Sequence, residues 1–79
     1  GLPVIEAMAC GTPVITSNTT SLVEISKNAA LLVNPNSTDA IRSSIEQLFY
    51  DEELKLQLST KGLIVAKSFI WDEIRQKFD

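Results

Sequence analysis

Histidine is absent from this sequence of 79 residues, and cysteine occurs once, at Cys10. Without histidine the chain cannot supply a Ser-His-Asp or Cys-His catalytic group, or a zinc site built from imidazole ligands. A single cysteine excludes a disulfide within the chain and is typical of a protein in a reducing compartment. We therefore expect no catalytic triad, no metal site and no cofactor in this chain.

Clusters of basic residues and long apolar runs are also missing. Seven Lys and Arg stand against ten Asp and Glu, and the basic residues are scattered between Lys27 and Lys77. Proteins that bind DNA or RNA concentrate positive charge, so we expect no nucleic-acid partner. The short apolar runs predict no membrane-spanning segment, and no signal peptide is visible. We expect a cytoplasmic location, with any membrane association supplied by other regions of the protein.

The residues at the start of the chain indicate part of a larger domain. Apolar residues make up 44% of the sequence and charged residues 22%, as is ordinary for an α/β protein. The sequence begins in what resembles a strand-to-helix turn at Gly1 and Leu2, whereas domains usually begin in exposed polar linkers. We expect further strands upstream of Gly1.

A short helix is predicted over residues 3–10. Pro3 suits its first position, and Gly11 suits its C-cap. Its apolar stripe consists of Val4, Ile5, Met8 and Ala9. Cys10 is interpreted as a small buried hydrophobic residue, because no base or cation lies near it in the sequence.

Two strands are predicted over residues 13–16 and 29–33, with a helical turn at 22–25 between them. The connection of about 13 residues is long enough for a parallel crossover and too long for a tight hairpin. Two parallel strands do not make a stable sheet alone. The alternation of strands and helices predicts an α/β fold with a doubly wound parallel sheet.

Ser37 is predicted to cap the next helix, with Asp39 in its first turn. The expected buried stripe of this helix is Ile41, Ile45, Leu48 and Phe49. Asp51 is expected to begin another helix, with Glu52 and Glu53 in its first turn rather than as metal ligands.

The apolar positions of that later helix are Leu54, Leu58, Ala66 and Phe69. Gly62 is expected to weaken or bend it. A last amphipathic helix is expected over residues 71–78, where Trp71 and Phe78 are interpreted as core or interlobe packing rather than a sugar-stacking platform. The whole chain is thus expected to hold two strands and about four helices.

Residues 1–15, GLPVIEAMACGTPVI, closely resemble a family-4 retaining glycosyltransferase of the two-lobed GT-B fold. In that family a pair of glutamates spans a glycine-rich turn and the helix after it. Glu6 matches the second glutamate, and the first would lie upstream of Gly1. The resemblance implies that residues 1–79 are a partial C-terminal, donor-binding lobe, with the N-terminal lobe and the first part of this lobe absent.

The resemblance extends along most of the chain, with departures. Residues 21–25 resemble a segment that usually contains Pro-Glu-Val, with Val23 in place of proline. Thr19 and Thr20 replace two glycines that often precede that segment. Residues 29–35 resemble the next strand and turn, and residues 67–71 resemble the family's Phe-Ser-Trp, with Ile70 in place of serine.

The resemblance implies a site for a nucleoside-diphosphate sugar. Glu6 would hold the ribose, because a carboxylate accepts two hydrogen bonds from vicinal hydroxyls. Gly1 and Leu2 would offer backbone N–H groups to the pyrophosphate at a helix N-terminus. Ser17 and Asn18 follow a strand at the edge where open α/β sheets place ligands, and are candidates for lining the cleft. From periodicity alone, Glu6 could equally be an exposed residue near a helix N-terminus.

The implied function is transfer of a sugar from a nucleotide-sugar donor to an unidentified acceptor, with retention of anomeric configuration. The catalytic glutamate would lie upstream, so this chain alone would be inactive and would pack against the rest of its own glycosyltransferase. Two alternatives stay open: a nucleotide-sugar epimerase or phosphorylase on the same fold, and a non-catalytic remnant that binds a partner protein through exposed apolar surface.

Overall fold

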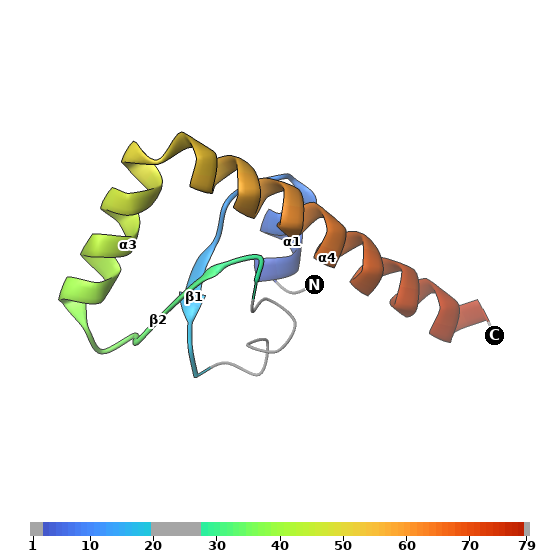
Figure 1. Ribbon diagram of the computed structural model, residues 1–79. Helices are drawn as coiled ribbons and strands as arrows, with labels where there is room; N and C mark the ends of the chain where they lie inside the picture. Colours follow the sequence, from blue (N-terminus) through green and yellow to red (C-terminus); the bar gives the residue numbers. More distant parts are fainter. Residues whose placement is uncertain (1–2, 20–27, 79) are drawn as a thin grey trace.

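The computed structural model describes residues 3–19 and 28–78 of the chain. These residues form a helix, two strands and two further helices in that order (Figure 1). The elements are α1 (Pro3–Ala9), β1 (Ile15–Ser17), β2 (Leu31–Val33), α3 (Thr38–Tyr50) and α4 (Glu52–Phe78). The helical turn predicted at 22–25 lies outside the described residues.

The two strands pair in parallel, as the length of their connection predicts. Ile15 lies opposite Leu31, and Ser17 lies opposite Val33. Hydrogen bonds at both ends extend the ladder, from Leu31 N to Val14 O and from Asn18 N to Val33 O, each 2.9 Å long. The expected α/β fold class with a parallel sheet is confirmed.

Both strands begin two residues later than predicted. Ala29 and Ala30 are 1% and 7% exposed, yet they precede the paired residues of β2. These two alanines are consecutive and both buried, so they pack in the core and do not follow the alternating pattern of a strand. Val14 is likewise buried before β1 begins.

α1 ends as Gly11 predicts, in a left-handed turn with φ of 74°. The N–H of Gly11 donates to the carbonyl of Met8 at 3.0 Å, and that of Thr12 donates to the carbonyl of Ala7 at 3.1 Å. This pair of bonds is a Schellman motif, which satisfies carbonyls at the helix end. The polar groups at this end of α1 are therefore satisfied locally.

The interpretation of Cys10 as a buried residue is wrong, because its side chain is exposed. Helical periodicity predicts burial only for residues inside the helix. α1 ends at Ala9, one residue earlier than predicted, so Cys10 lies outside it. Ala9 is also exposed, whereas Ile5 and Met8 of the predicted stripe are buried.

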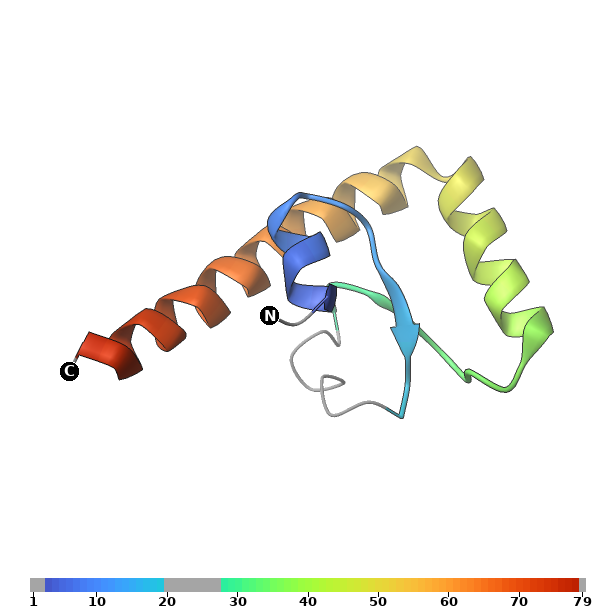
Figure 2. The ribbon, with the colours of Figure 1, turned by 180° about the vertical axis from the view of Figure 1, so that it is seen from behind.

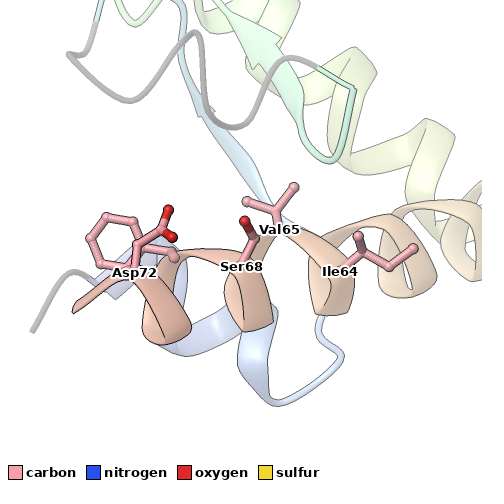
Figure 3. A pocket seen from close by; sticks show the side chains of 5 residues that line it. Ile64, Val65, Ser68 and Asp72 are labelled. Atoms are coloured by element: carbon pink, nitrogen blue, oxygen red, sulfur yellow. The ribbon is translucent and has the colours of Figure 1, made fainter. Parts of the chain in front are cut away.

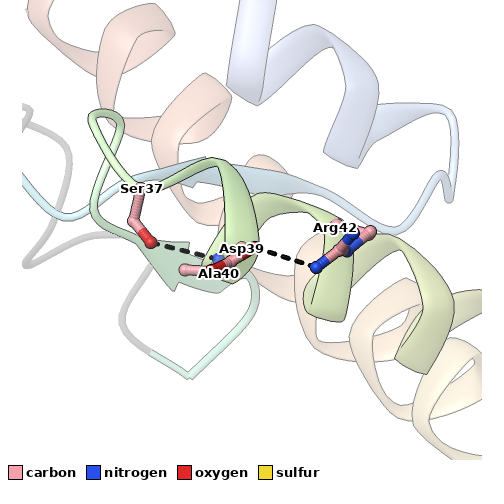
Figure 4. A network of polar contacts seen from close by, with 4 residues as sticks. All are labelled: Ser37, Asp39, Ala40 and Arg42. Atoms are coloured by element: carbon pink, nitrogen blue, oxygen red, sulfur yellow. Dashed lines mark hydrogen bonds and ion pairs between the residues drawn. The ribbon is translucent and has the colours of Figure 1, made fainter.

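Polar side chains cap the two later helices as predicted. Ser37 Oγ accepts from Ala40 N at 3.1 Å, and Arg42 forms a 2.8 Å ion pair with Asp39 in the same turn (Figure 4). Asp51 Oδ1 accepts from Leu54 N at 2.9 Å at the start of α4. The Ser37 cap contributes about 1 kcal/mol, whereas the exposed ion pair contributes little.

The predicted buried stripe of α3 is wrong in this structure. Ile45 is 55% exposed and Phe49 is 70% exposed, while Ile41 and Leu48 are half-buried. Among the described residues α3 contacts β2 and α4, and it stands apart from α1 (Figures 1 and 2). An amphipathic pattern indicates a helix face that favours burial. The described elements do not cover this face of α3.

α4 is one continuous helix from Glu52 to Phe78, so the separate helix expected over residues 71–78 is wrong. Gly62 lies inside it without interrupting it, because one glycine costs a helix only about 1 kcal/mol relative to alanine. Trp71 is 61% exposed, so it does not pack in the core of the described residues, and its interpretation as interlobe packing stays a prediction. The side chain of Phe78 lies outside the described residues.

The core lies where α4 crosses α1 beside the strands (Figures 1 and 2). Its buried members are Ile5, Met8, Val14, Ala29, Ala30 and Ala66. Met8 is the largest fully buried side chain among the described residues. α1 is thus held between the segments around the strands and the middle of α4.

Candidate functional site

Glu6, the candidate ribose ligand, lies on α1 with its side chain exposed. The neighbouring Ile5 is 5% exposed and belongs to the core. The same helix therefore buries one face and presents the carboxylate on another, as expected from the spacing. The carbonyl of Glu6 accepts from Cys10 N at 3.2 Å, which ties this residue to the end of the helix.

A shallow pocket of about 260 Å³ lies beside Glu6, between α1 and the C-terminal part of α4. Its apolar wall includes Ile5 and Ala9 from α1 and Ile70 and Ile74 from α4. Lys77 and Glu73 join Glu6 as its charged side chains. Sequence reasoning missed this neighbourhood, because nothing in the local patterns indicates that residues 70–77 pass close to Glu6.

Ser17 and Asn18 lie at the C-terminal end of β1. Ser17 Oγ lies 2.7 Å from Thr19 Oγ1 and accepts from Thr19 N at 3.1 Å, so its hydroxyl belongs to a local turn. The side chain of Asn18 is exposed, and its N–H donates to Val33 at the end of β2. Their role in lining a cleft stays a prediction.

The N-terminal end of α1 and the C-terminal end of β1 lie on the same side of the molecule (Figures 1 and 2). This follows from the chain direction, because α1 runs one way along the core and β1 returns in the other. The structure thus brings the N-terminal end of α1, the helix that carries Glu6, to the same side as Ser17 and Asn18. Gly1 and Leu2 lie outside the described residues, and their role stays a prediction.

Gly62 has a packing environment that sequence reasoning missed. It is buried, and a Cβ added there would lie 3.2 Å from Cγ of Met8. The glycine therefore permits a close approach between α4 and α1. The available signal was its position between Leu58 and Ala66, two buried residues that place Gly62 on the buried face of α4.

A second pocket lies along α4 (Figure 3). The side chains of Ile64, Val65, Ser68 and Asp72 rise from the same side of the helix. The hydroxyl of Ser68 and the carboxylate of Asp72 are thus set beside apolar surface. Of the predicted site residues that the structure describes, none lines this pocket.

The described part of the chain contains no group of three or more His, Cys, Asp or Glu residues that could hold a metal ion. Within the same residues, no helix combines the length and the apolar character needed to cross a membrane. The expectation that catalysis uses no metal or cofactor in this segment stays a prediction.

Residues 1–63 match the protein family described as glycosyl transferases group 1. The chain belongs to this family. It is 44% identical over 72 residues to O-antigen chain mannosyltransferase B of Escherichia coli, a match that covers 91% of this chain and 19% of that protein. It is also 37% identical over 76 residues to O-antigen chain mannosyltransferase RfbU of Salmonella typhimurium, with coverage of 96% and 20%.

A solved structure shares the fold of this family member. Sucrose-phosphate synthase from Thermosynechococcus elongatus superposes with a TM-score of 0.76 and 30% identity, over 99% of this chain and 22% of that one. The α/β architecture with a small parallel sheet thus matches part of a GT-B glycosyltransferase. The chain spans about a fifth of the length of both mannosyltransferases.

Proposed function

We propose that the protein containing this chain transfers a mannosyl residue from a nucleoside-diphosphate donor to an acceptor. The observation that carries this proposal is the 44% identity to O-antigen chain mannosyltransferase B over 91% of the chain. A second relative, also named an O-antigen chain mannosyltransferase, supports the choice of mannose. By this proposal residues 1–79 belong to the donor-binding lobe of a two-lobed, family-4 enzyme that works in the cytoplasm.

Glu6 is the residue of this chain that we assign to the donor. Its carboxylate is exposed on a helix whose opposite face is buried, so it is accessible and its backbone is held in place. An ionised carboxylate can accept one hydrogen bond from each of two vicinal hydroxyls, which suits the ribose of a nucleotide. The glutamate that contacts the transferred sugar, and the basic residues that stabilise the leaving phosphate, belong to other parts of the protein.

Gly1 and Leu2 complete the proposed donor site through their backbone N–H groups. Amides at the start of a helix are free to bind the pyrophosphate, and no polar side chain is needed for that contact. Ser17 and Asn18 would line the cleft at the carboxyl end of β1, on the same side as the N-terminal end of α1.

We further propose that transfer retains the anomeric configuration of mannose. The work of catalysis is then positioning of donor and acceptor, together with electrostatic stabilisation of the departing diphosphate. In this scheme Glu6 contributes by binding a part of the donor that does not react. Its removal should therefore act mainly on donor affinity and less on the chemical step.

The test uses the full-length protein with guanosine- and uridine-diphosphate mannose as donors. Glu6→Ala removes two charge-assisted hydrogen bonds, which predicts a rise in donor KM on the order of tenfold or more. Glu46→Ala, at an exposed glutamate in α3, is the matched control and should leave donor KM unchanged. An unchanged donor KM in Glu6→Ala would contradict the assigned role.

Analysis of the products separates this proposal from its alternatives. Mannosyl transfer yields a glycoside and a nucleoside diphosphate, and nuclear magnetic resonance of the new linkage reports whether the configuration is retained. An epimerised sugar would indicate an epimerase, and a sugar phosphate would indicate a phosphorylase. A full-length protein that binds neither donor would favour the non-catalytic binding role.

A further inference from the structure

The crossing of α1 and α4 is built around a glycine in the interior of a long helix. Gly62 is buried on the face of α4 that packs against α1. A Cβ at this position would lie 3.2 Å from Cγ, 3.4 Å from Cβ and 3.7 Å from Cα of Met8. The first of these distances is tighter than nine in ten real Cβ contacts, so Met8 would have to give way by a few tenths of an ångström.

Met8 has little freedom to give way. Its side chain is 0% exposed and lies in the core with Ile5, Val14 and Ala66. The atoms closest to Gly62 are those nearest the backbone of Met8, not the flexible end of the side chain. Because protein interiors are closely packed, we expect a small displacement of α1 to relieve the extra volume at this point.

Displacement of α1 would move Glu6. This residue lies two positions before Met8 in the same short helix, and its carbonyl is bonded to Cys10 N. The C-terminal end of the helix also lies near α4, because a Cβ built at Gly11 would be 3.4 Å from Ser59 Oγ. Because Glu6 and Met8 share one short helix, a displacement at Met8 would be passed on to Glu6.

We propose that Gly62 is a positioning residue for Glu6: its missing side chain sets how closely α1 lies on α4, and so where the Glu6 carboxylate meets the donor. This inference rests on the proposed role of Glu6 in donor binding. It predicts that Gly62 acts on binding of the nucleotide rather than on the chemical step, although it lies outside the candidate donor site.

The test is the Gly62→Ala variant of the full-length protein, assayed with the nucleoside-diphosphate mannose that supports turnover. A shift of a few tenths of an ångström should strain the Glu6 hydrogen bonds without removing them, so donor KM should rise on the order of fourfold, less than in Glu6→Ala, with kcat unchanged. Thr60→Ala changes an exposed residue of α4 and should leave donor KM unchanged. An unaltered donor KM in Gly62→Ala overturns the inference.

A double-mutant cycle with Glu6→Ala shows whether the effect passes through Glu6. Gly62→Ala should have no further effect on donor KM in the Glu6→Ala background. If it raises donor KM by the same factor there, Gly62 does not act through Glu6 and the inference is wrong. If Glu6→Ala itself leaves donor KM unchanged, the proposed role of Glu6 fails first, so the two failures are distinguishable.

Trimming the opposing side chain covers the case in which Gly62→Ala does not fold. Met8→Ala removes the Cγ atom that lies 3.2 Å from the added Cβ. Because Met8→Ala empties part of the core, Met8→Ala alone is the reference, and adding Gly62→Ala to it should cost no further stability and leave donor KM unchanged. A double variant that is less stable than Met8→Ala, or that has a higher donor KM, would overturn the proposed contact.

Discussion

At the scale of single residues, glycines shape the surroundings of Glu6 more than polar side chains do. Gly11 turns the chain at the end of α1 with a φ of 74°, and Gly62 lets α4 approach Met8. The two have different physical roles, because the first supplies a backbone conformation and the second supplies space. Substitutions at the two positions should therefore fail for different reasons.

Gly11→Ala should lower stability through the backbone alone. An alanine with positive φ costs about 1 kcal/mol, whereas its Cβ would meet Ser59 only at an ordinary contact distance of 3.4 Å. In the full-length protein this predicts a thermal midpoint lower by about 2 °C. Gly11→Asn should be milder, because asparagine tolerates the left-handed region. Equal midpoints for the two variants would contradict a conformational cause.

At the scale of elements, local sequence determines where α3 and α4 begin, whereas the length of α4 depends on the absence of a residue that ends a helix. Ser37 and Asp51 start α3 and α4 through side-chain bonds to the backbone a few residues ahead. α4 then continues through residues 67–71, which contain neither proline nor glycine. A helix continues through such a segment unless its surroundings favour another conformation.

Ser37→Ala should destabilise α3 by about 1 kcal/mol, because Ala40 N loses its partner. Ser37→Asp should preserve the cap, and Ser43→Ala, inside the helix, should be neutral or slightly stabilising. Amide exchange in the first turn of α3 is the direct measurement, with faster exchange expected only in Ser37→Ala. Similar protection in Ser37→Ala and Ser43→Ala would show that the cap contributes nothing.

At the scale of the whole molecule, much apolar surface is left uncovered by the described residues. Among residues 3–19 and 28–78, eight large apolar side chains are exposed, on α3 and along α4. The sheet consists of the parallel pair β1 and β2, and a two-stranded sheet has little stability of its own. Surface of this kind marks an interface, which agrees with the proposal that the chain packs against the rest of a glycosyltransferase.

The polypeptide of residues 1–79, produced alone, should therefore lack a cooperative urea transition. Its apolar residues would bind a hydrophobic dye such as ANS, and amides in β1 and β2 should exchange rapidly. Urea denaturation, ANS fluorescence and amide exchange measure these three properties, and sedimentation gives the oligomeric state. A sigmoidal transition and slow exchange at Leu31–Val33 would contradict this expectation, and a folded oligomer would favour the stand-alone binding role.

The sequence by itself determined the features that depend on near neighbours. Ser37 caps α3, Gly11 ends α1, and the length of the connection between the strands agrees with their parallel pairing. The family follows from a run of residues whose match requires no structure. The exposure of Glu6 also follows from its place on one helical turn.

The tertiary structure alone decided which apolar faces are covered and how closely the helices approach. Phe49 belongs to an amphipathic stripe and is nevertheless 70% exposed, whereas Gly62, predicted only to weaken or bend its helix, lies against Met8. Both outcomes depend on segments distant in the sequence, namely the elements around α3 and the position of Met8. A local pattern states what a residue favours, and only the packed chain determines which partner it meets.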